Sequence, residues 1–74
     1  MTEKLTDKQA LFAVIQALGG DWDTQRAVLG LRVAGHDKAD DDATAKAARG
    51  ALRALTEDGL IERPDPGQAV YRLA

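Results

Sequence analysis

Three basic side chains share one edge of a predicted helix in the C-terminal half of the chain. Lys46, Arg49 and Arg53 are three and four residues apart, so on a helix they fall within roughly 60° of arc. Positive side chains grouped in this way bind phosphates, and a guanidinium can donate two hydrogen bonds to guanine. The alternative is an ordinary solvated helix face, and Glu57 at the end of the same edge supports it. We favour the binding interpretation because three basic residues share the edge.

The residue inventory argues against other chemistries. The chain has no Ser, Cys or Asn and a single His, which leaves few combinations for nucleophilic catalysis, acid–base catalysis or metal binding. His36 with Asp37, Asp40 and Asp42 lacks the glycine and distal glutamate of a calcium-binding loop, so a solvated loop is favoured. We therefore expect no enzyme activity, no cofactor and no metal.

Length and charge limit the possible architectures. Seventy-four residues, 1–74, make one small domain in which nearly every apolar side chain must contribute to the core. The lack of cysteine fits a reducing compartment. The segment from Met1 to Leu5 has no apolar run, and no segment is apolar over the length needed to span a membrane. We therefore expect a cytoplasmic protein. The net charge of -2 is unfavourable for a nucleic-acid binder, but residues 1–42 carry -3 and residues 43–74 carry +1.

Capping signals and apolar spacing predict two helices in the N-terminal half. Thr6 and Gln9 form a capping box, which starts a helix over about 7–18 that Gly19 and Gly20 end. Its apolar stripe contains Leu11, Val14, Ile15 and Leu18. A second helix, about 24–34, is capped by Asp23 or Thr24 and stopped by Gly35. Between them, Trp22 is predicted to form a connector or a single strand bridge and to cover an edge of the core.

The second helix has two apolar sides. Ala27, Val28, Leu31 and Ala34 share the first. Leu29 and Val33 form the second, which is either another buried side or a dimer contact, and we favour burial. Arg26 and Arg32 are interpreted as solvated charges.

A polar, acidic loop over 36–42 leads into a third helix, about 42–58, capped by Asp41 or Asp42. Its apolar side contains Ala45, Ala48, Leu52, Leu55 and Thr56. Gly50 on the outer side would suit close approach of DNA or of a partner helix, although an alanine- and glycine-rich composition explains it as simply. After Gly59 the pattern predicts a β-hairpin over 60–73, with strands over 60–63 and 68–73 joined by a turn over 64–67.

The segment from about 43 to 73 resembles the recognition helix and wing of winged helix-turn-helix regulators of the GntR and MarR type. The residues that carry the resemblance are Leu52, Leu55, Glu57, Gly59, Leu60, Ile61 and Arg63, followed by Tyr71, Arg72 and Leu73. The resemblance implies a mainly α fold of three helices and a small β-hairpin, in which the third helix enters a major groove of DNA. It also implies that Lys46, Arg49 and Arg53 face DNA, that Thr44 lies near a phosphate and that Arg63 approaches the backbone from the wing.

Two hypotheses follow. The first is a small transcriptional regulator that binds double-stranded DNA with its third helix, as a homodimer or with a protein partner, because one domain of this size reads only a short half-site. The second is a winged-helix module that binds protein and not DNA, which the acidic loop and the net charge favour.

Overall fold

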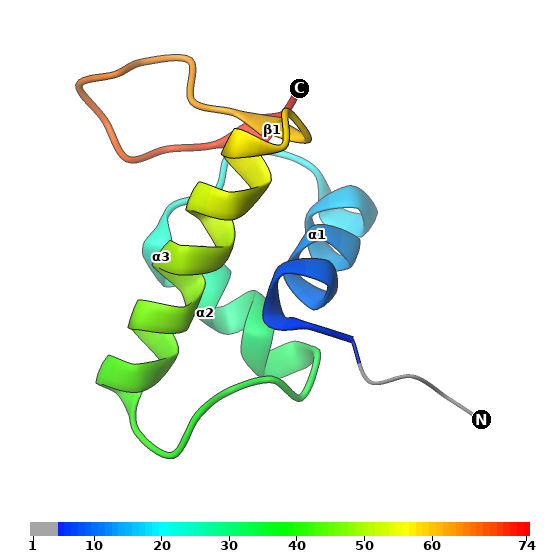
Figure 1. Ribbon diagram of the computed structural model, residues 1–74, viewed down its shortest axis with the longest axis vertical. Coiled ribbons are helices and arrows are strands. Elements are labelled where there is room, and N and C mark those ends of the chain that lie inside the picture. Colours follow the sequence, from blue (N-terminus) through cyan, green and yellow to red (C-terminus); the bar gives the residue numbers. More distant parts are fainter. Residues whose placement is uncertain (1–4) are drawn as a thin grey trace.

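The computed structural model describes residues 5–74 as three helices followed by a small antiparallel sheet (Figure 1). The elements in chain order are α1 (Asp7–Leu18), α2 (Thr24–Val33), α3 (Asp41–Glu57), β1 (Ile61–Glu62) and β2 (Arg72–Leu73). The prediction of a mainly α chain with a small β-hairpin is therefore confirmed. Residues 1–4, on which part of the expectation about the N-terminal segment depends, lie outside the described residues.

The first two helices begin where the capping signals predict. The Thr6 Oγ1 accepts the Gln9 N–H at 3.1 Å, and the Gln9 Oε1 accepts the Thr6 N–H at 3.0 Å, which completes the capping box of α1. Gly19 ends that helix with a φ of 64°, a conformation that favours glycine. Asp23 caps α2 by accepting the Arg26 N–H at 2.8 Å.

The third helix begins one residue earlier than predicted. Asp40 is its N-cap, because its Oδ1 accepts the Ala43 N–H at 2.7 Å. The assignment of the cap to Asp41 or Asp42 was wrong. Both residues lie in the first turn instead, where the helix dipole favours a negative charge.

The hairpin has much shorter strands than the predicted 60–63 and 68–73. Ile61 pairs with Leu73 and Glu62 pairs with Arg72, and the chain between them forms a wide loop (Figure 1). Pro64 and Pro66 have no N–H to donate to a strand ladder, which explains why the pairing stops at two residues.

Of the two alternatives for the segment around Trp22, a connector or a single strand bridge, the structure has the bridge, and its partner is Tyr71. The Trp22 N–H donates to the Tyr71 carbonyl and the Tyr71 N–H donates to the Trp22 carbonyl, both at 2.7 Å. The Trp22 ring is buried, and its Nε1 donates to the Gly19 carbonyl at 3.0 Å. The Arg26 guanidinium lies over the ring, 4.0 Å from its centroid, so Arg26 is not simply a solvated charge.

Side chains from all three helices and the sheet form one core. Its largest buried members are Trp22, Leu11, Ile15, Leu31, Leu52, Leu55 and Ile61. Helices α1 and α2 approach closely at Gly30, where a Cβ atom would lie 3.2 Å from the Leu11 Cδ1 and 3.3 Å from the Trp22 Cζ3. Gly30 thus explains how the tryptophan ring fits between these two helices.

Three large apolar side chains predicted to face the core are exposed. Leu18 is 65% exposed, Leu29 is 57% exposed and Val33 is 82% exposed. The prediction of a second buried side on α2 was wrong, because α2 uses its other sides to contact α1 and α3.

Candidate nucleic-acid interface

One face of α3 points to solvent along the whole helix. Its exposed residues are Asp42, Lys46, Arg49, Gly50, Arg53 and Glu57. At about 100° per residue they occupy roughly 100° of arc, so they form one continuous surface. The basic residues lie in the middle and the two acidic residues at the ends. With a rise of about 1.5 Å per residue, the basic part extends roughly 10 Å along the helix.

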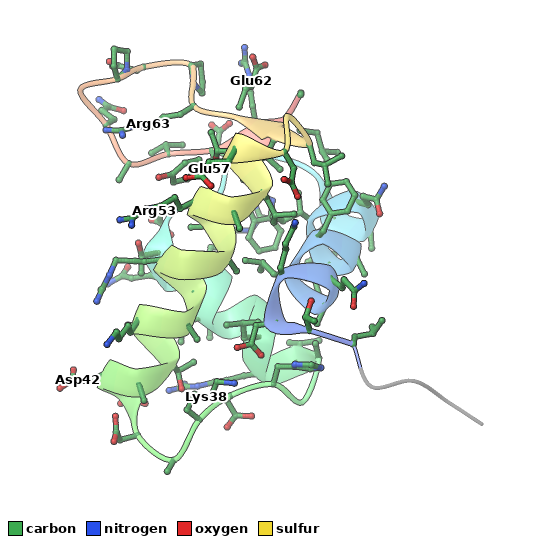
Figure 2. All side chains as sticks on the ribbon, viewed as in Figure 1. Lys38, Asp42, Arg53, Glu57, Glu62 and Arg63 are labelled. Carbon is green, nitrogen blue, oxygen red and sulfur yellow. The ribbon has the colours of Figure 1, made fainter. Side chains whose placement is uncertain are left out.

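A cleft of about 350 Å³ separates this face from the hairpin loop. Arg49, Arg53 and Glu57 line it from α3, while Arg63 and Tyr71 line it from the two ends of the hairpin loop. Figure 2 shows Arg53 and Glu57 on the side of α3 that faces the loop carrying Arg63. The structure therefore brings together three predicted contact residues from two separate segments: Arg49, Arg53 and Arg63.

Free positive charge is concentrated at α3. Within residues 5–74, the side chains of Lys46, Arg49 and Arg53 form no ion pair and no hydrogen bond. Four of the other basic residues are paired with carboxylates: Lys8 with Asp58, Arg32 with Asp41, Lys38 with Asp7, and Arg72 with Glu62. The local charge at the cleft is thus more favourable to an anion than the net charge of -2 indicates.

Arg63 has a second role that the sequence did not reveal. Its Nε donates to the Gln68 carbonyl and its Nη2 donates to the Pro66 carbonyl, both at 2.7 Å. These bonds hold the two sides of the hairpin loop together in place of a longer strand ladder. They also fix the guanidinium at the cleft.

Thr44 does not join the exposed face. It is 1% exposed, its Oγ1 accepts the Lys38 N–H at 2.9 Å, and its hydroxyl donates to the Asp40 carbonyl at 3.0 Å. The expectation that Thr44 lies near a phosphate is corrected, because its side chain is on the buried side of α3 and secures the loop before the helix.

The acidic loop is held against the start of α1 by two contacts to Asp7. Lys38 Nζ lies 2.9 Å from the Asp7 Oδ2, and His36 Nδ1 lies 3.0 Å from the Asp7 Oδ1. The hydrogen bond from Lys38, followed by that from His36, lowers the pKa of Asp7 below its ordinary value of 3.8. Among residues 5–74, no group of three or more His, Asp or Glu side chains is arranged to hold a metal ion.

The cleft also contains residues that were not predicted as site residues, and two of them come from outside α3 and the ends of the predicted turn. Thr24, the first residue of α2, and Tyr71 line it together with the arginines. The Trp22–Tyr71 bridge brings these residues to the same place, although they are far apart in the sequence. Helical spacing does not predict this contact, and the sequence contains no other signal for it.

Comparisons with known protein families, with characterised proteins and with solved structures found no match. In the part of the chain that the structure describes, no helix has the length and apolarity needed to cross a membrane.

Proposed function

We propose that this chain is a winged helix-turn-helix domain that binds double-stranded DNA through α3 and the hairpin, and that it acts as a transcriptional regulator. The observation that carries the proposal is the exposed face of α3. It carries three basic side chains without ion pairs within residues 5–74, and two of them, Arg49 and Arg53, line a cleft whose opposite wall contains Arg63.

The arrangement of the elements supports the winged-helix part of the proposal. Three helices precede a hairpin, and the segment between α1 and α2 forms a bridge to Tyr71, the residue immediately before β2. Trp22 thus lies beside the hairpin in the position of a third strand, although it forms only a single bridge. The loop between β1 and β2 extends beyond the sheet, which is the place of a wing (Figure 1).

The dimensions suit insertion of α3 into a major groove. A helix with its side chains is about 10–12 Å wide, and the major groove is about 12 Å wide. Lys46, Arg49 and Arg53 would face the groove, where lysine and arginine bind phosphates and guanine edges. A Cβ atom at Gly50 would meet no other side chain or element of the described part of the chain within 4 Å, so the surface there is open and the helix backbone could approach the DNA.

A protein partner is the second candidate, and Glu57 is the observation that favours it. Its carboxylate lines the same cleft as the arginines and would repel a phosphate. A peptide that carries both a basic and an acidic side chain would match this mixture of charges.

Salt-dependent binding separates the two candidates. We expect fluorescence anisotropy with a labelled random duplex to show binding at about 20 mM salt and a steep fall by about 200 mM. Three or four phosphate contacts predict a slope of roughly -3 for log K against log salt. No binding at the lower salt concentration would contradict the DNA proposal.

A pair of variants with equal net charge locates the surface. R49Q/R53Q removes two free charges from α3, and R32Q/R72Q removes two charges that are already paired elsewhere. We expect the first variant to lose at least about tenfold in affinity and the second to bind nearly as the unmodified chain does. Equal losses in both would show that only the net charge matters and that α3 is not the contact surface.

A further inference from the structure

An apolar groove lies between α1 and the C-terminal end of α2, and its lining residues are all different from those of the cleft. Its volume is about 320 Å³. Alanine and valine side chains from α1 (Ala13, Val14 and Ala17) line it together with the larger, exposed Leu5, Leu18 and Val33. We refer to these six residues as the α1–α2 groove.

The groove and its surroundings on α1 have no charged side chain beyond the first turn. Residues 9–20 form an uncharged run in a chain of which 30% is charged. A helix face that remains in water is normally polar and charged. The one titratable lining residue, His36, has its Nδ1 bound to Asp7 at the end of the groove. An exposed, uncharged helix face of this kind is typical of a surface that another protein covers.

We propose that the α1–α2 groove is covered by a second copy of this chain, related to the first by a two-fold axis. Such an interface requires a surface that fits itself. The groove has both parts of the fit: Val33 and Leu18 project from it, 82% and 65% exposed, while Ala13 and Ala17 offer room for an incoming side chain. A two-fold rotation can bring the projecting residues of each copy over the alanines of the other.

Charge favours a second copy over an acidic or basic partner. Each chain carries a net charge of -2, so two copies repel each other over most orientations. The α1–α2 groove has almost no charge, and contact there keeps the remaining charges of both copies in solvent. An acidic or basic peptide would find no complementary charge in it. The groove therefore suits an equally uncharged surface.

Size indicates how strong this association is. A stable interface buries about 800 Å² on each partner, which is about a sixth of the 4925 Å² surface of this chain. The groove belongs to one helix of 12 residues, about 18 Å long, and to the end of another. We therefore expect a reversible dimer with a dissociation constant in the range of about 1 to 100 µM.

The dimer leaves the candidate nucleic-acid interface open. The groove involves α1 and α2, whereas the basic residues lie on α3 and the hairpin (Figure 1). The inference does not depend on DNA binding, and its test contains no DNA. Failure of one proposal is therefore distinguishable from failure of the other.

Sedimentation velocity from about 1 µM to about 1 mM tests the inference. We expect the mass to rise from one chain to two, and Val33→Lys to raise the dissociation constant at least about tenfold. Leu60→Lys is the matched control, because it adds the same charge at an apolar residue that is 41% exposed and lies outside the groove. Thermal unfolding followed by circular dichroism verifies that both variants fold.

Three outcomes would overturn the proposal: a monomer at every concentration, a Val33→Lys variant that dimerises as the unmodified chain does, or an equal loss in Leu60→Lys. A monomer would show that no second copy covers the groove. A mixed sample of isotope-labelled and unlabelled chains adds a direct test of the contact. We expect nuclear Overhauser effects between chains from the Val33 methyl groups to Ala13 or Ala17, and their absence in a confirmed dimer would also contradict the arrangement.

Discussion

The Arg63 Nε donates a hydrogen bond to the Gln68 carbonyl across the hairpin loop at 2.7 Å. With the bond to Pro66, this contact connects two sides of a loop that has no strand pairing of its own. We expect Arg63→Ala to cost less than about 1 kcal/mol in free energy of unfolding, because the bonds are exposed. The same change should speed amide exchange at Gln68, whose N–H donates to the Asp65 carbonyl inside the loop.

Arg72→Ala is the control for this prediction. It removes an exposed ion pair with Glu62 but leaves the loop bonds of Arg63 in place. Exchange at Gln68 should therefore remain close to that of the unmodified chain. If Arg63→Ala also leaves this exchange unchanged, the guanidinium does not hold the loop.

Glu57 is expected to weaken DNA binding at the cleft. Removing its charge in Glu57→Gln eliminates a repulsion with phosphate of about 1 kcal/mol at contact distance in water, so affinity should rise roughly three- to fivefold. Glu62→Gln makes the same chemical change on a side chain that points away from the cleft (Figure 2) and should have a smaller effect. A decrease in affinity for Glu57→Gln would indicate that the carboxylate itself contacts the partner.

Two helical glycines should respond in opposite ways to alanine. Gly50 is exposed with nothing within 4 Å, so Gly50→Ala should stabilise the chain by about 0.5–1 kcal/mol through helix propensity. Gly30 faces the Leu11 side chain and the Trp22 ring, and an added methyl group there should cost about 1–3 kcal/mol. Urea denaturation measures both. Equal stability of the two variants would mean that α1 and α2 can separate at little cost.

The ion pairs of Asp7 should make stability depend on pH. Its pKa is lowered in the folded chain by Lys38 and His36, so the carboxylate stabilises the fold above its ordinary pKa of 3.8. This contribution is lost as the pH falls below 3.8 through the lower, folded value. We expect Asp7→Asn to cost about 0.5–1 kcal/mol at neutral pH, since the pairs are partly exposed.

The difference between Asp7→Asn and the unmodified chain should disappear in acid, as measured by denaturation at a series of pH values. Asp37→Asn is the matched control, because within residues 5–74 the exposed Asp37 side chain forms no ion pair or hydrogen bond. A difference that persists at low pH would assign the effect of Asp7→Asn to something other than its charge.

The sequence predicts those parts of this fold that local chemistry decides. The capping box at Thr6 and Gln9 and the stop at Gly59 involve residues within one turn, so they can be recognised without knowing the rest of the structure. The basic edge of α3 is likewise a matter of spacing on one helix. These features determine the helix positions to within about one residue.

Features that depend on packing between elements were harder to predict from the sequence. Helical spacing places Thr44 on the side of α3 opposite Lys46, because residues two apart lie about 200° apart, but it could not show that the Thr44 side chain bonds the loop at Lys38. Helical spacing placed Leu29 and Val33 on one side of α2 and could not show that no neighbouring element covers it. The composition of the cleft depends on the Trp22–Tyr71 bridge, which joins the connection between α1 and α2 to the residue before β2.

That bridge also makes the cleft a property of the fully folded chain. Tyr71 lines the cleft, and so does Thr24, which lies two residues after Trp22. Detaching the last strand would therefore separate Tyr71 from Thr24 and open the cleft. A partly folded chain that keeps only the helical bundle would retain the basic edge of α3 but have no cleft. Occupation of the cleft should therefore slow the exchange of the Trp22 and Tyr71 amides together, as a single cooperative unit.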